Sequence, residues 1–242
     1  MKDMMAILDI LENSYPEAKC SLDFATPLEL LVATVLSAQC TDERVNQVSK
    51  SLFKKYRAAR DYAAAPLEEL EEDIRPTGFF RNKAKSLKSC GAGLVERFHG
   101  EVPRTLEELV TLHGIGRKTA NVILGSAFDT PGIVVDTHVG RVAQRIGLTR
   151  HGDPVKIERD LMELVPRGRW SKFSHQLIWH GRRICTARNP RCSPCPLLDH
   201  CDYGQKTLGK SGPDESGAAR KQRTASRTQS KVKAGGKTRG SR

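Results

Sequence analysis

Four of the seven cysteines lie close together, with the spacing C-x6-C-x2-C-x5-C: Cys185, Cys192, Cys195 and Cys201. Such a group, in a chain whose start does not resemble a signal peptide, indicates a metal centre rather than a disulfide framework. Tetrahedral zinc sites usually have two C-x2-C pairs and only one is present here, whereas iron–sulfur clusters accept looser spacings. The spacing alone leaves the choice between zinc and an iron–sulfur cluster open.

The loop between the first two of these cysteines carries two arginines, Arg188 and Arg191. A loop fixed by metal ligands is a rigid support for exposed cations, and such cations bind DNA phosphates. We therefore predict that both arginines contact nucleic acid.

The stretch "LHGIGRKTANVILG" (112–125) predicts a tight turn that leads into a helix. Gly114 and Gly116 allow the backbone to turn sharply and to approach a ligand closely. The first N–H groups of a helix form an anion site, so a DNA phosphate could be held there by the main chain. Arg117, at the start of the same helix, is a further candidate for DNA contact.

Lys118 lies at the start of this predicted helix, where the helix dipole is positive. A cation at that position is disfavoured by about 0.3–1 kcal/mol. The same field and the neighbouring Arg117 favour the neutral amine, which is the nucleophilic form. Asp136, in "VVDTHVGRV" (134–142), precedes a second predicted helix and is a candidate N-cap. A capping carboxylate stays ionised, so an N-cap role and a catalytic role are compatible. Lys118 as a plain phosphate contact remains the alternative.

The elements that must position these residues are predicted to be helices. Helix starts are indicated by Thr26, Pro66 and Asp153, and by a capping box formed by Thr105 and Glu108. Alternation typical of strands is scarce. The sequence therefore predicts an all-α body.

Composition and charge narrow the class of protein. No apolar run approaches the length of a membrane span, and the first twenty residues resemble an amphipathic helix, so we expect an intracellular protein without membrane contact. Nine of the twelve net positive charges belong to residues 205–242, which carry eleven Lys/Arg against two acidic residues. This segment has few large apolar residues and is predicted to be disordered. It either contacts nucleic acid or serves solubility.

Taken together, these motifs resemble endonuclease III, a family of DNA glycosylases with β-lyase activity in the helix-hairpin-helix superfamily. The resemblance rests on "LLVATVLSAQCTDERVN", "LHGIGRKTANVILG", "VVDTHVGRV" and the four-cysteine spacing. It extends in continuous order over residues 1–204.

The resemblance implies a two-lobed, all-α helix-hairpin-helix glycosylase fold. A six-helix barrel domain would comprise residues 21–132. A second domain, from residues 1–20 and 133–204, would hold a 4Fe–4S cluster on the four cysteines. Duplex DNA would lie across the cleft between the domains.

The resemblance also implies roles for single residues. Lys118 matches the family's nucleophile and Asp136 its catalytic aspartate. Gln39, in "SAQCTD", matches the residue that fills the gap left by an extruded base. Phe79, in "PTGFFRNKA", matches an apolar wedge, and His138 matches a histidine near the DNA.

The sequence departs from the family pattern at three positions. His113 replaces a proline before the hairpin, Phe79 replaces a leucine at the wedge, and Thr77 replaces an apolar neighbour. Lys118 itself argues against the adenine-specific and mismatch-thymine relatives, which lack a lysine at that position.

The implied function is a bifunctional glycosylase and abasic-site lyase of base excision repair. It would act as a monomer on duplex DNA with oxidised pyrimidines or abasic sites, in the cytoplasm at the nucleoid. Two alternatives stay open, namely a monofunctional glycosylase on the same scaffold and a non-catalytic iron–sulfur protein that binds DNA.

Overall fold

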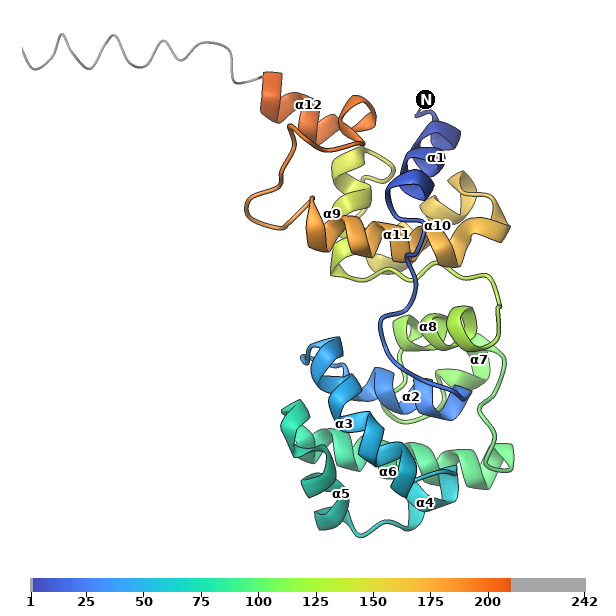
Figure 1. Ribbon diagram of the computed structural model, residues 1–242. Helices are drawn as coiled ribbons and strands as arrows, with labels where there is room; N and C mark the ends of the chain where they lie inside the picture. Colours follow the sequence, from blue (N-terminus) through green and yellow to red (C-terminus); the bar gives the residue numbers. More distant parts are fainter. Residues whose placement is uncertain (1, 210–242) are drawn as a thin grey trace, which may run out of the picture.

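The computed structural model describes residues 2–209, which form twelve α-helices and three short 3-10 segments, with no strand among them (Figure 1). The all-α prediction is confirmed. Within this part of the chain, none of the helices is both long and apolar enough to span a bilayer.

The first lobe is built on one aliphatic core, in which Leu30, Leu36 and Ile123 are fully buried. Its helices are α2 (Pro27–Leu36), α3 (Asp42–Lys55), α4 (Ala59–Ala64), α5 (Leu67–Ile74), α6 (Phe80–Phe98), α7 (Leu106–Leu109) and α8 (Arg117–Ala127), with the 3-10 segment η1 (Arg75–Thr77) before α6. The central α6 packs against α4 and α5, and α2 packs against α8.

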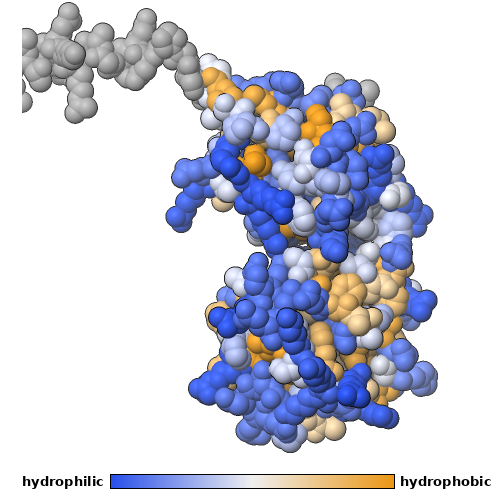
Figure 2. All heavy atoms as spheres, in the orientation of Figure 1, coloured by the Kyte–Doolittle hydropathy of each residue, from blue (hydrophilic) through white to orange (hydrophobic). Residues whose placement is uncertain are grey.

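The second lobe has a separate core, in which Ile7, Phe173 and Leu177 are fully buried. It consists of α1 (Met4–Ser14), α9 (Thr137–Ile146), α10 (Pro154–Leu164), α11 (Trp170–Arg183) and α12 (Asp202–Gly209), with η2 (Arg167–Arg169) and η3 (Leu198–His200). Both ends of the described chain therefore belong to one lobe, and the molecule narrows between the two halves (Figure 2).

Local signals explain several helix starts. The hydroxyl of Thr26 accepts a hydrogen bond from the N–H of Glu29 at 3.2 Å, and the carboxylate of Asp153 accepts one from Lys156 at 3.0 Å. Thr105 caps α7 in the same way, at 3.3 Å from the N–H of Glu108. These three predicted starts are confirmed. Because side-chain caps satisfy otherwise unpaired helical N–H groups, they fix where each helix begins.

The last helix corrects one predicted boundary. Residues 205–209 were predicted to begin the disordered segment, but they continue α12. Asp202 lies in the first turn of this helix and pairs with the ammonium of Lys2 at 2.6 Å, which ties α12 to the N-terminus. A composition average over 205–242 is dominated by the later residues and misses this local anchor. The rest of the predicted disordered segment lies outside the described residues.

Candidate active site and metal centre

The predicted hairpin joins α7 to α8. Gly114 has φ of +80°, where a side chain would be strained, and a Cβ there would lie 3.1 Å from the Cβ of Ser86. The buried Ile115 holds the turn against the first core, and its N–H donates to the carbonyl of Leu112 at 3.1 Å. Gly116 is extended and caps α8 without a side chain. The first N–H groups of α8 are therefore open to an anion.

Lys118 is exposed on the first turn of α8 and lines a cleft between the lobes. The first lobe contributes Gln39, Asp42 and Lys118 to this interlobe cleft, and the second lobe contributes Asp136, His175, Trp179 and Arg182. The structure thus brings the two predicted catalytic side chains to one cavity. They are placed there by the starts of two helices from different lobes.

Asp136 caps α9. Its Oδ1 atom accepts hydrogen bonds from the N–H groups of His138 and Val139, each at 2.8 Å. The predicted N-cap is confirmed. No hydrogen bond to Oδ2 is formed within the described chain, so one carboxylate oxygen is fixed by the helix and the other remains available in the cleft.

Arg117 has a partner within the protein. Its guanidinium forms a two-pronged ion pair with Glu158 of α10, with N–O distances of 2.8 and 2.7 Å. The side chain of Glu158 is 5% exposed, and the side chain of Arg117 is 45% exposed. Arg117 therefore joins the two lobes, and its predicted contact with DNA stays a prediction.

Gln39 and Phe79 line a groove that adjoins the interlobe cleft and includes Gly114. Both residues have left-handed backbone conformations, with φ of +54° and +48°. The side chain of Phe79 is 65% exposed. Strained residues that are not glycine gather at binding sites, because only a rigid surrounding structure can hold them. The conformations are therefore consistent with two residues held ready for a ligand.

His138 lies beside the cleft and does not line it. Its Nδ1 atom is 3.0 Å from Nη2 of Arg141, and burial lowers its pKa. A Cβ added to Gly181 would lie 2.9 Å from the Cβ of His138, so α9 and α11 approach closely at this point. The predicted DNA contact of His138 stays a prediction.

The two arginines of the cysteine loop have different surroundings. Arg188 is exposed, and its side chain forms no hydrogen bond or ion pair within residues 2–209. Arg191 donates to the carbonyl of Arg183 and lines the cavity between the cysteines. The geometry leaves Arg188 as the freer of the two predicted DNA ligands.

Sequence reasoning missed one wall of the cleft. His175, Trp179 and Arg182 follow each other at four- and three-residue steps on α11, so they share one helix face. Burial lowers the pKa of His175. Arg182 pairs with Asp42 of α3 at 3.0 Å across the cleft. The i, i+4, i+7 spacing of polar and aromatic residues was the available signal.

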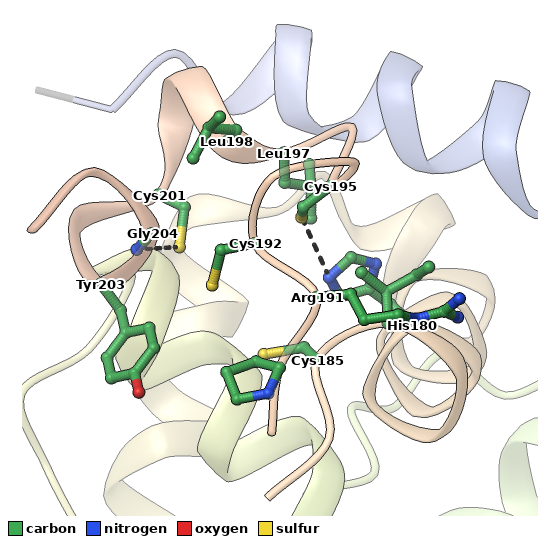
Figure 3. A pocket seen from close by; sticks show the side chains of 12 residues that line it. His180, Cys185, Arg191, Cys192, Cys195, Leu197, Leu198, Cys201, Tyr203 and Gly204 are labelled. Atoms are coloured by element: carbon green, nitrogen blue, oxygen red, sulfur yellow. Dashed lines mark hydrogen bonds between the residues drawn. The ribbon is translucent and has the colours of Figure 1, made fainter. Parts of the chain in front are cut away.

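The four predicted metal ligands line one cavity (Figure 3). All are free thiols. Among the described residues, no three His, Cys, Asp or Glu side chains converge on a position for a single ion. Four thiols that line one cavity without converging on a single position fit a multi-iron cluster better than tetrahedral zinc, whose ligands must meet at one point.

Polar groups around these sulfurs also fit thiolate ligands. Cys185 Sγ accepts from Nη1 of Arg145 at 3.3 Å, and Cys201 Sγ accepts from the N–H of Gly204 at 3.3 Å. Burial raises the pKa of Cys195 to about 11, so a bound metal is needed to hold this sulfur as the thiolate. The cavity, donors and ligand set are those of an iron–sulfur site.

Comparisons with known families agree with this geometry. Residues 32–167 match the HhH-GPD superfamily of base excision DNA repair proteins. Residues 185–201 match the iron–sulfur binding domain of endonuclease III, which settles the choice that the cysteine spacing left open.

Individual proteins match over most of the chain. Endonuclease III of Synechocystis sp. is 54% identical over 82% of this chain and 91% of its own length, and that of Bacillus subtilis is 49% identical over 85% and 94%. A solved structure of a trapped endonuclease III–DNA covalent intermediate superposes with a TM-score of 0.81 at 48% identity, covering 86% of this chain and all of that one. The chain therefore belongs to the endonuclease III family.

Proposed function

We propose that Lys118 is the nucleophile and Asp136 the acid–base residue with which this chain removes oxidised pyrimidines and cuts at abasic sites. Endonuclease III is a bifunctional DNA glycosylase and abasic-site lyase of base excision repair, and the chain belongs to that family. The single observation that carries the assignment is the meeting of both side chains in the interlobe cleft.

The reaction begins with extrusion of the damaged base, which costs a few kcal/mol of stacking and pairing. The amine of Lys118 attacks the sugar C1′ and the C1′–N bond to the base breaks, its electron pair leaving with the base. The free oxygen of Asp136 stabilises positive charge that develops on the sugar. Because Oδ1 is held by two N–H groups of α9, the carboxylate cannot turn away from that position.

The second stage cuts the strand. Loss of a proton from Lys118 and opening of the sugar ring give a Schiff base between Nζ and C1′. This cation acidifies the C2′ proton, which a general base removes. The C3′–O bond then breaks by β-elimination, and the 3′ phosphate leaves. Water hydrolyses the Schiff base and releases the free amine.

The remaining site residues would bind DNA. The open N–H groups of α8 bind a phosphate, while Gln39 and Phe79 enter the opened duplex at the extruded base. We propose that the protein acts as a monomer at the nucleoid in the cytoplasm. Residues 21–132, and residues 1–20 with 133–204, are its proposed domains. The four cysteines would hold a 4Fe–4S cluster, which braces the loop that carries Arg188.

Borohydride trapping tests the proposal, because it reduces a Schiff base to a stable amine. Wild-type protein should become covalently attached to DNA that carries an abasic site or thymine glycol, and should cut it. Lys118→Gln should do neither, yet still bind abasic DNA. Lys156→Gln is the matched control, since Lys156 also lies in the first turn of a helix, α10.

Three outcomes separate the candidates. Trapping of Lys118→Gln at the wild-type level would transfer the nucleophile to another amine. Base release without trapping by the wild type would indicate a monofunctional glycosylase. Binding with neither release nor cutting would leave a non-catalytic DNA-binding protein.

A further inference from the structure

One lysine of α6 is buried in the first lobe. The Nζ atom of Lys83 donates to two backbone carbonyls, those of Leu36 and Thr77, each at 2.8 Å, and the residue is 5% exposed. No carboxylate within the described residues forms an ion pair with it. A buried cation without a counter-ion is costly unless its donors are satisfied, so these two carbonyls determine where the ammonium lies.

The two carbonyls belong to the roots of two different loops. Leu36 ends α2, three residues before Gln39, and Thr77 ends η1, two residues before Phe79. Gln39 and Phe79 are the residues with left-handed backbones at the DNA-facing groove. Lys83 lines this same groove. A single side chain therefore joins the bases of both loops.

The other hydrogen bonds hold each loop to itself, while α3, which follows the loop of Gln39, packs against η1. The N–H of Cys40 donates to the carbonyl of Ser37 at 3.1 Å, and the N–H of Gly78 donates to that of Arg75 at 3.2 Å. Among the hydrogen bonds of the described chain, those of Lys83 are the ones that connect the α2 end to the η1 end. Lys83 is thus the hydrogen-bonded link between the two loop ends within the described chain.

We propose that Lys83 is a positioning residue that keeps Gln39 and Phe79 at a fixed separation, so that both enter the duplex together. The inference rests on the proposed DNA-inserting roles of these two residues. The ammonium group of Lys83 is directed to two backbone carbonyls and not to the cleft that holds Lys118 and Asp136. Its effect should appear in base extrusion and not in the chemistry at Lys118.

The chain offers a matched control on the same helix. Nζ of Lys88 also donates to two backbone carbonyls, those of Ala63 at 2.9 Å and Ala65 at 2.5 Å. Those carbonyls lie in the last turn of α4 and in the residue after it, where no proposed DNA-binding residue is found. Lys83→Met and Lys88→Met remove the same number and kind of hydrogen bonds, and differ in what those bonds hold.

The test uses holoenzyme under single-turnover conditions with two substrates. With thymine glycol in duplex DNA, Lys83→Met should excise the base about tenfold more slowly than wild type, the scale expected for lost charge-assisted hydrogen bonds. Cutting at a pre-formed abasic site should change little, because no base has to be extruded. Lys88→Met should leave both rates unchanged. Equal excision rates for Lys83→Met and Lys88→Met would overturn the proposal.

A triple variant tests whether Lys83 acts through the loops. The effect of Lys83→Met should shrink when Gln39→Ala and Phe79→Ala are already present, since the residues that it positions are gone. Full additivity would contradict positioning. If Lys83→Met does not fold, Lys83→Gln, which retains one amide donor, should give a smaller defect of the same kind.

Failure of the underlying insertion roles gives a separate signature. If Gln39→Ala and Phe79→Ala alone excise at the wild-type rate, the insertion roles are wrong. The positioning claim is then decided by amide hydrogen exchange of residues 37–41 and 77–80. Exchange there should accelerate in Lys83→Met and not in Lys88→Met, and unchanged exchange would refute the positioning claim.

Discussion

Two helices begin on opposite walls of the interlobe cleft, and their starts differ. At α9 the carboxylate of Asp136 occupies the first N–H groups. At α8 Gly116 has no side chain to offer, and the first N–H groups stay open. A helix start that is already capped fixes a side chain of the protein, whereas an open one can fix a ligand.

The open start is held in place by other means. Arg117 reaches from α8 to the buried Glu158 of α10 and clamps the first turn against the second lobe. The ion pair replaces the positional role of a cap without using the N–H groups. Lys118, the next residue, is thereby fixed relative to Asp136 in the other lobe.

Replacing the capping acid should have the largest effect. Asp136→Asn should slow base release by about a hundredfold, the order expected when a pre-organised charge is removed from a site. The free energy of unfolding should change little, because asparagine also caps helices well. Single-turnover kinetics measures the rate of base release, and urea unfolding measures the free energy of unfolding. A near-normal rate would reduce Asp136 to a structural cap.

The substitution Arg117→Met tests whether the ion pair between Arg117 and Glu158 holds the two lobes together. This change leaves the buried Glu158 without its partner and should lower the free energy of unfolding by about 2 kcal/mol, less than for a fully buried pair because Arg117 is partly exposed. Urea unfolding of Arg117→Met, Glu158→Gln and the double variant measures the coupling. If the two single effects simply add, the ion pair does not hold the lobes together.

The open start of α8 can be filled by substitution. Gly116→Asp should weaken binding to abasic DNA about tenfold, because its carboxylate takes the N–H groups and repels phosphate. The backbone there is extended and a Cβ meets nothing within 4 Å, so the fold should be slightly stabilised. Gly152→Asp adds the same charge at another open position, and its affinity loss should be smaller. Equal losses would mean that charge alone matters.

The smallest effect concerns His175, which lies in the cleft near both helix starts. Burial lowers its folded-state pKa, as does Arg182, while Asp136 opposes the shift. The unfolded chain therefore binds this proton more readily, and stability should be lost as the pH falls below about 6.5. His175→Gln should flatten that slope in urea unfolding between about pH 5.5 and 7.5. An unchanged slope would exclude His175 as the source.

Local chemistry was readable from the sequence. The caps at Thr26, Thr105 and Asp153 involve partners three residues away, so the pattern itself contains the interaction. The cysteine spacing indicated a metal centre in the same manner. The hairpin motif located the start of α8, and Asp136 located the start of α9.

Contacts between the lobes were not readable. Arg117 and Glu158 are separated by 41 positions, and nothing local distinguishes an arginine that binds a carboxylate from one that binds a phosphate. Lys83 is a comparable case. Its two hydrogen bonds depend on the end of α2 and the end of η1 lying side by side, which the local sequence does not show. The α11 residues His175, Trp179 and Arg182 were missed because they line a cleft only together with residues of the first lobe, and this arrangement is not visible in the local sequence.

The second lobe combines both ends of the chain, and this fixes an order of assembly during synthesis. The hydroxyl of Tyr15 lies 2.9 Å from Nδ1 of His180, and the two residues are 165 positions apart in the sequence. This contact can form only after His180 has been synthesised. At a typical synthesis rate that interval is roughly 10–30 s, during which the first lobe can complete its core. The apolar face of α1 stays uncovered for that time. The four cysteines are made later still, so iron can be bound only after the first helix of this lobe already exists.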